Sequence, residues 1–145
     1  MVRNGGRCIF CRIVAAQAER SVVFEDEAAL VVVDIAPVNP GHLLVMPKEH
    51  FPYLADLDEE TGAHLFRLGM RASAAVRNSG VRCEGVDLFL ADGEAAGQEV
   101  FHVHLHVIPR FVGDRFRVGA EGGHIPRPRP ELDAIAELVR EEWPT

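Results

Sequence analysis

Three histidines, His102, His104 and His106, alternate with apolar residues in one short segment of the chain. If this segment is a β-strand, the three imidazoles share one face, and Val103, Leu105 and Val107 point into the core. Imidazole changes its charge near neutral pH and also binds metals. The pattern therefore leaves three possibilities: acid–base or nucleophilic catalysis, a metal site built from histidine alone, and an exposed surface without function.

A glycine-containing segment, Ala96-Gly97-Gln98, comes just before the histidines. Glycine allows backbone N–H groups to approach an anion closely. An anion-binding loop beside a nucleophilic histidine is the combination that phosphoryl or nucleotidyl transfer needs. We therefore expect the chain to act on a small molecule that contains phosphate.

Cys8 and Cys11 have the spacing of zinc ligands, but such a pair supplies only half of a site. A redox pair normally follows a strand, whereas only a polar seven-residue segment precedes Cys8, and two idle buried thiols are the third alternative. The residues that could complete a metal site are His50, His64, His102, His124 and Cys83.

The composition limits the possible partners and compartments. The chain has 145 residues and a formal net charge of −7, which disfavours broad binding to nucleic acid or to anionic membranes. No apolar run approaches the ~18–20 residues of a membrane span, and no signal peptide is visible. An odd, small number of cysteines favours a reducing compartment, so we expect a cytoplasmic protein. Residues 110–129 carry five arginines against two acidic residues, and this segment is either an anion-binding region or a solvated loop.

Residue periodicity predicts three helices. Residues 8–18 have apolar residues at helical spacing, and residues 130–143 are expected to form an amphipathic C-terminal helix. A longer helix is expected at about 57–78, with Asp56 as its N-cap and Glu59 as the capping-box partner. The apolar stripe of this long helix consists of Leu65, Leu68, Ala72, Ala75 and Val76.

Five apolar or β-branched runs are predicted to be strands, at residues 21–25, 29–35, 43–46, 86–91 and 101–108. Because most of them follow one another without a helical crossover, we expect an α+β fold with a five-stranded antiparallel sheet and the long helix packed on it. We expect residues 1–145 to form a single domain, with a flexible tail at 1–7, a core at 8–110, and a loop and C-terminal helix at 111–145.

The segment His102-Val-His104-Leu-His106-Val-Ile108 resembles the histidine triad (HIT) pattern, in which three histidines alternate with apolar residues, at every position. Ala96-Gly97-Gln98, the run from Asp34 to His42, and Leu43-Leu-Val-Met-Pro-Lys48 also resemble this family. The resemblance covers about residues 8–110. It is greatest to the branch of purine-nucleoside phosphoramidases and their bacterial relatives, followed by the diadenosine polyphosphate hydrolases.

The resemblance implies hydrolysis or transfer of nucleoside monophosphates through a covalent nucleotidyl-histidine. His104 would be the nucleophile, His106 would bind the phosphate and assist the leaving group, and His42 would complete the site together with His102. A neutral imidazole is a good nucleophile towards phosphorus, and water can cleave the resulting P–N bond. The chemistry would need no metal, because imidazoles and N–H groups near Gly97 would meet the phosphoryl charge.

The resemblance also suggests which residues bind the substrate, expected to be a purine nucleotide that gives an AMP-like product. Asp34 would accept hydrogen bonds from the ribose, and backbone groups of Gly97, Gln98 and Glu99 would meet the phosphate. Ile9, Phe10, Ile13 and Ile35 would form the apolar walls of the base pocket.

Two positions depart from the family pattern. Ala91 replaces an amide that contacts phosphate, and Glu99 replaces a small hydroxyl residue and adds a carboxylate that would repel phosphate unless it turns away. The N–H of residue 99 remains. These changes put the rate and the preferred substrate in question, so a nucleotide-binding protein with little turnover is the second function that we consider.

By resemblance to zinc-carrying relatives, Cys8, Cys11, His50 and His102 would form a closed, structural zinc site. A structural protein in which all the histidines are ligands is the third function that we consider. The resemblance also implies a homodimer whose two sheets join into ten strands. In such a dimer the small residues Gly69, Ala72, Ser73 and Ala75 could pack against the twin helix.

Overall fold

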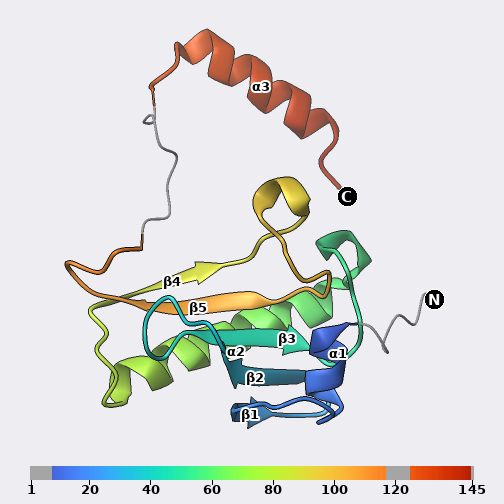
Figure 1. The fold of residues 1–145 in the computed structure, drawn as a ribbon. Helices are drawn as coiled ribbons and strands as arrows, with labels where there is room; N and C mark the ends of the chain where they lie inside the picture. Colours follow the sequence, from blue (N-terminus) through green and yellow to red (C-terminus); the bar gives the residue numbers. More distant parts are fainter. Residues whose placement is uncertain (1–7, 117–124, 145) are drawn as a thin grey trace. The chain divides into compact units, whose positions relative to one another are not determined.

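The computed structural model describes residues 8–116 and 125–144. The chain divides into two compact units, Met1–Arg115 and Phe116–Thr145. The first unit holds the sheet and the two helices packed on it (Figure 1). In the second unit, α3 (Arg129–Glu141) confirms the C-terminal helix expected at 130–143.

Five strands form one antiparallel sheet in the order β1-β2-β3-β5-β4. This arrangement confirms the predicted α+β class. The hairpin of β1 and β2 turns at Asp26, whose carboxylate accepts hydrogen bonds from the N–H groups of Ala28 and Ala29. The strands are β1 (Val22–Glu25), β2 (Ala29–Val33), β3 (Leu43–Pro47), β4 (Gly85–Phe89) and β5 (Leu105–Arg110).

The long helix α2 (Glu59–Asn78) covers one face of the sheet and passes behind it in Figure 1. Its buried face includes Gly69, where an added Cβ would lie 2.7 Å from Cδ2 of Leu105. The small residues Gly69 and Ala72 therefore allow the helix to approach its own sheet, and the expectation that they face a twin helix is wrong for both. Ala75, predicted in the apolar stripe, is exposed.

The opposite face of the sheet carries Leu30, Val32, Leu44 and Met46, which pack with Phe10 of α1 (Ile9–Val14). The helix is shorter than the predicted 8–18, since Ala16 has a positive φ of 57°. The apolar residues of the histidine segment lie on the other face of the sheet, as predicted. Val103, Leu105 and Val107 all belong to the core beneath α2.

The predicted strands 29–35 and 86–91 both end two residues too late, and two further boundaries are wrong for identifiable reasons. The N-cap of α2 is Asp58, whose side chain accepts a hydrogen bond from the Thr61 N–H, whereas Asp56 accepts one from the Tyr53 N–H in the preceding turn. The fifth strand begins at Leu105 and not at residue 101. The N–H of Val103 instead donates to the carbonyl of Phe51, outside the sheet.

The predicted arginine-rich loop is in part ion-paired. Arg110 is the last residue of β5 and pairs with Asp87 and Asp114. Arg127 pairs with Glu131 at the start of α3. Arg117 and Glu121 lie outside the described residues. Two of the five arginines therefore already have carboxylate partners.

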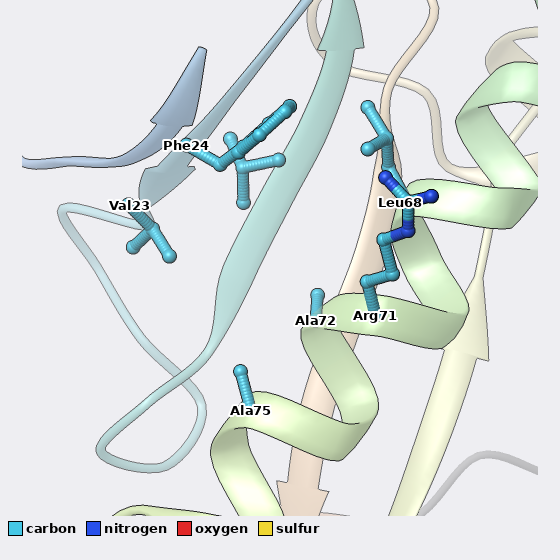
Figure 2. A pocket seen from close by; sticks show the side chains of 7 residues that line it. Val23, Phe24, Leu68, Arg71, Ala72 and Ala75 are labelled. Carbon is cyan, nitrogen blue, oxygen red and sulfur yellow. The ribbon is translucent and has the colours of Figure 1, made fainter.

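A pocket of about 230 Å³ lies between β1 and α2. Figure 2 shows Val23 and Phe24 on one side of it and Leu68, Ala72 and Ala75 of α2 on the other. It lies between the sheet and α2, on the face opposite Phe10 and the α1 cluster.

Across the described segments, 8–116 and 125–144, we find no helix long and apolar enough to cross a membrane.

Candidate active site

A cavity of about 720 Å³ opens on the face of the sheet that carries α1. Nine of the residues predicted from the sequence line it: Ile9, Phe10, Ile13, Asp34, Ile35, Gly97, Glu99, His104 and His106. Its volume falls within the range of about 300–1,000 Å³ that is usual for small-molecule sites. Gln98, His42 and His102 were also predicted in the site but are not part of the lining.

His104 is held with one ring nitrogen available to the cavity. Its Nδ1 lies 2.8 Å from the backbone oxygen of His102, which can only accept a hydrogen bond, so Nδ1 carries the proton. The Nε2 atom of the neutral ring therefore keeps its lone pair. Burial lowers the pKa of His104, and Phe10 packs edge-on against its ring with centroids 4.8 Å apart. The result is an oriented, neutral imidazole that can act as a nucleophile.

His42 and His106 form a hydrogen-bonded pair with defined proton positions. The N–H of Val38 donates to Nδ1 of His42 at 3.1 Å, so Nε2 of the neutral His42 ring carries the proton. That Nε2 lies 2.9 Å from Nδ1 of His106, which must therefore accept. Nε2 of His106 is left as an N–H donor. Burial, followed by the nearby charges of His104 and His42, lowers the pKa of His106 to about 4 and keeps the ring neutral at pH 7.

Asp34 stands beside this pair at the end of β2. One carboxylate oxygen accepts a hydrogen bond from the Ala36 N–H at 2.9 Å, and the other lies 3.5 Å from Nε2 of His42. The carboxylate also lines the cavity. The Asp34 carboxylate can therefore interact electrostatically with His42 and still contact a ligand in the cavity.

The predicted phosphate loop differs from the expectation at two positions. The N–H of Gly97 donates to the carbonyl of Glu94 at 2.9 Å, and that of Gln98 donates to the carbonyl of Gly93 at 3.1 Å. The Gln98 side chain is buried and bonds to the backbone of Gly93, Pro52 and Val100. The N–H groups of Gly97 and Gln98, which were expected to bind phosphate, are therefore hydrogen-bonded within the short 3₁₀ turn at Glu94–Ala96. Within the described ranges, the N–H of Glu99 makes no hydrogen bond.

The apolar wall of the cavity is wider than predicted. Ile9, Phe10 and Ile13 of α1 line it, as do four larger apolar residues that were not predicted from the sequence: Val32, Val33, Leu44 and Val100. Because alternate residues of a strand face the same side, the strand pattern of β2 and β3 could have pointed to Val32 and Leu44, which pack with Phe10 of α1. Ile35 is 95% exposed and stands at the rim.

The two departures from the family pattern lie in the same cavity lining. Ala91 is 7% exposed and offers no side-chain donor. Glu99 brings a carboxylate. Arg12 and Arg20, which were not predicted as site residues, also line the cavity, although Arg20 already pairs with Glu25.

Cys8, Cys11, His50 and His102 come together in one cluster beside α1. Nδ1 of His102 lies 3.6 Å from Sγ of Cys8, 3.5 Å from Sγ of Cys11 and 3.4 Å from Nδ1 of His50. Tetrahedral zinc ligands at about 2.3 Å for sulfur and about 2.0 Å for nitrogen are about 3.3–3.8 Å apart, so the cluster could hold zinc.

The proton positions around His102 support the same conclusion. Its Nε2 lies 2.7 Å from the carbonyl oxygen of Pro47 and so carries the proton, which leaves the Nδ1 lone pair for a metal. Both nitrogens are thus used away from the cavity, so His102 is placed as a metal-cluster residue and not with the cavity histidines. Burial, followed by the hydrogen bond and charge of Cys8, raises the pKa of Cys11 to about 11, and a bound metal would favour the thiolate instead.

The remaining candidate ligands lie elsewhere. His64 pairs with Asp26 at 2.7 Å, and the Cys83 thiol contacts the carbonyl of Gly85. His124 lies outside the described residues.

Asp34, His42 and His106 also lie close enough together to be considered for a metal. The Val38 hydrogen bond argues against this use. A metal on Nε2 of His42 would require the proton to move to Nδ1, where it would face the N–H of Val38. This group therefore fits a hydrogen-bonded relay better than a metal site.

Comparisons with known proteins agree with this geometry. The HIT domain family matches residues 15–113. An uncharacterized HIT-like protein of Mycobacterium tuberculosis is 37% identical over 134 residues, covering 92% of this chain and 91% of that protein. Adenylylsulfatase HINT3 of Arabidopsis thaliana is 35% identical over 106 residues, covering 71% of this chain and 52% of that protein.

Solved structures resemble the whole fold. A HIT family protein from Bacillus subtilis has a TM-score of 0.87 at 31% identity and covers 96% of this chain and 99% of its own. A zinc-bound histidine triad family protein from Mycobacterium smegmatis has a TM-score of 0.75 at 37% identity, with coverage of 95% and 99%.

Proposed function

The chain belongs to the HIT family of nucleotide hydrolases and transferases, and from this premise we propose that it cleaves nucleoside 5′-phosphoramidates through a covalent nucleotidyl-histidine. The observation that carries the proposal is the set of proton positions at the cavity. His104 keeps a lone pair on Nε2, and His106 keeps a proton on Nε2. One atom can attack phosphorus, and the other can donate to a phosphoryl oxygen.

The proposed reaction has two steps. Nε2 of His104 attacks the α-phosphorus, and the bond from phosphorus to the leaving nitrogen breaks. The amine leaves with a proton from solvent, while the His106 N–H stabilises the charge on the phosphoryl oxygen. Water then attacks phosphorus, breaks the bond to His104, and releases the nucleoside monophosphate and a proton. While phosphorus is bonded to Nε2, the His104 ring is cationic, and the carbonyl of His102 stabilises it by accepting the Nδ1–H hydrogen bond.

We assign the remaining groups by their place in the cavity. Asp34 would bind the ribose, the Glu99 N–H would contact the phosphate, and Ile9, Phe10 and Ile13 would hold a purine, with Ile35 at the rim. We assign no ligand contact to the Gly97 and Gln98 N–H groups, because both are already bonded. Residues 1–145 would form one HIT domain around the core at 8–110. Cys8, Cys11, His50 and His102 would hold a structural zinc ion that takes no part in either step.

A single-turnover experiment tests the reaction. The protein is mixed in excess with adenosine 5′-phosphoramidate and quenched. We expect an acid-labile adenylyl adduct that is absent in His104→Ala. Control variant Cys83→Ser, which alters a thiol outside the cavity and the metal cluster, should form the adduct normally. If wild type forms no adduct and releases no AMP, the proposal is wrong.

Two observations favour a second candidate, a nucleotide-binding protein with little turnover. Ala91 offers the phosphate no donor, and the Glu99 carboxylate shares the cavity. Tight binding of AMP without an adduct from the phosphoramidate would support this candidate. Hydrolysis of diadenosine polyphosphates with no cleavage of the phosphoramidate would instead indicate the neighbouring branch of the family.

We also propose a homodimer that continues the sheet across β4. Both β1 and β4 are edge strands, but β1 has a register irregularity between Val22 and Phe24, whereas β4 pairs regularly with β5. Exposed Leu88 of β4 and exposed Phe66 and Met70 of α2 would extend the interface onto the helix.

A further inference from the structure

An ionic cluster with one buried carboxylate lies at the end of β5. The Asp114 side chain is only 4% exposed and accepts two hydrogen bonds from the guanidinium of Arg110, at 2.6 and 2.7 Å. The same guanidinium reaches Asp87 on β4. The bonds from Arg110 hold the pKa of Asp114 well below its usual range, so this carboxylate is charged. A buried carboxylate requires hydrogen-bond donors and opposite charges to offset its loss of hydration.

Asn39 provides the remaining link, from a loop 75 residues earlier in the chain. Its amide nitrogen donates one proton to Asp114 at 2.9 Å and the other to the carbonyl of Pro109 at 2.9 Å. The residue is 8% exposed. An amide NH₂ has two protons to donate, and both are used here. The side chain of Asn39 therefore fastens its loop to the end of β5.

The fastened loop is the one that delivers His42. The carbonyl of Asn39 accepts the N–H of His42 at 3.1 Å, and the N–H of the neighbouring Val38 donates to Nδ1 of the same histidine. The carbonyl of His42 in turn accepts the N–H of Asp34. The turn at residues 38–42 thus sets which nitrogen of His42 carries its proton.

We infer that Asn39 is a positioning residue for the proposed reaction. Anchored on Asp114 and Pro109, it keeps the Val38 N–H on Nδ1 of His42. The His42 proton then stays on Nε2, directed at His106. Asn39 does not line the cavity and acts through His42. The inference rests on the proposed function for its effect on rate, but its effect on the histidine protons is independent of any substrate.

The first test is spectroscopic and needs no substrate. Nitrogen-15 NMR of the imidazoles distinguishes Nδ1–H from Nε2–H rings. In wild type we expect the Nε2–H form for both His42 and His106. In Asn39→Ala, His42 should populate both forms. Asn39→Asp places a carboxylate against Asp114 and should disturb the turn more. If Asn39→Ala fails to fold, Asn39→Ser, which keeps one donor, should show a smaller shift in the same direction.

The second test separates positioning from binding. With adenosine 5′-phosphoramidate, Asn39→Ala should lower kcat at least tenfold and change KM less than about threefold. Asp58→Ala is the control, because it removes a hydrogen bond at the N-terminus of α2 while leaving the 38–42 turn intact. It should leave kcat and both tautomers unchanged.

Wild-type tautomers and wild-type kcat in Asn39→Ala would overturn the inference, as would an equal loss of kcat in Asp58→Ala. If wild type itself does not cleave the phosphoramidate, the proposed function fails. The NMR result would then still decide whether Asn39 sets the protonation of His42.

Discussion

The backbone oxygen of His102 accepts a hydrogen bond from Nδ1 of His104 at 2.8 Å. The ring of His102 belongs to the cluster with Cys8, Cys11 and His50, whereas the ring of His104 faces the cavity. Any change that moves the backbone at residue 102 therefore also changes the orientation of the cavity imidazole. The proposed structural metal and the proposed nucleophile are mechanically coupled through one carbonyl group.

The first prediction concerns metal removal through Cys11→Ser. Wild type is expected to bind about one zinc ion per chain, and the variant should bind far less. Because the metal would link α1 to the segment before β5, we expect Tm to fall by at least about 10 °C. We also expect a loss of kcat, since the His102 carbonyl would no longer be fixed. Metal analysis, calorimetry and single-turnover kinetics measure these effects.

Two variants serve as controls for the metal prediction. Cys83→Ser alters a thiol outside the cluster and should keep both zinc and Tm. His42→Ala alters the second group of possible ligands and should still retain about one zinc ion per chain. A drop in zinc content in His42→Ala, or full zinc content in Cys11→Ser, would contradict the assignment of the ligands.

The second prediction is an activity that persists at mildly acidic pH. An ordinary imidazole with a pKa of about 6.5 is only about 10% neutral at pH 5.5. His106 has a pKa of about 4, and the pKa values of His42 and His104 are also lowered by burial. We expect kcat/KM at pH 5.5, after subtraction of the uncatalysed rate, to stay well above the roughly tenth of its pH 7.5 value that an ordinary imidazole would leave. A tenfold fall that follows one protonation near pH 6.5 would disprove it.

The third prediction is the effect of the same shift on stability. In the unfolded chain His106 titrates near its usual pKa of about 6.5, and in the folded chain near 4. Between these values the unfolded state binds more protons, so the free energy of unfolding should fall as the pH falls from 6.5 towards 4. Urea unfolding at several pH values measures the slope. His106→Gln should reduce it, and an unchanged slope would count against this explanation.

Side-chain alternation and ligand spacing could be predicted from the sequence, because they depend on local periodicity. Val103 and Leu105 lie in the core as the strand pattern requires, although regular pairing begins only at Leu105. The start of β5 at Leu105 could not be predicted, because the Val103 N–H finds its acceptor at Phe51, far away in the sequence.

The other features that the sequence did not predict also depend on contacts or turn geometry that local periodicity does not reveal. Asp56 and Asp58 both precede the long helix, and only the geometry of the turn before it decides that Asp58 is the cap. The donors at Gly97 and Gln98 are lost to a turn that the sequence shows only as a glycine-containing loop. The link from Asn39 to Asp114 joins residues 75 positions apart, so no local pattern announces it.

The fourth prediction concerns the proposed dimer. Met70→Glu places a charge on an exposed apolar residue of α2, next to Gly69, whose added Cβ would lie 3.9 Å from Leu88 of β4. It should convert a dimer into a monomer, as measured by light scattering after gel filtration. Val23→Glu is the matched control at the opposite edge of the sheet, on β1, and should remain dimeric. If only Val23→Glu dissociates, the interface lies at β1, and a monomeric wild type would exclude the dimer.

The fifth prediction compares two glycines of the same helix. An added Cβ at Gly69 would lie 2.7 Å from Leu105, whereas one at Gly62 would meet nothing within 4 Å. Gly69→Ala must displace the buried Leu105 side chain from its place under α2 and should destabilise the fold by about 1–3 kcal/mol. Gly62→Ala gains helix propensity without a clash and should stabilise it by about 0.5–1 kcal/mol. Urea unfolding of the two variants should therefore give shifts of opposite sign. Shifts of the same sign would show that the Leu105 side chain makes room for the added methyl group without loss of packing.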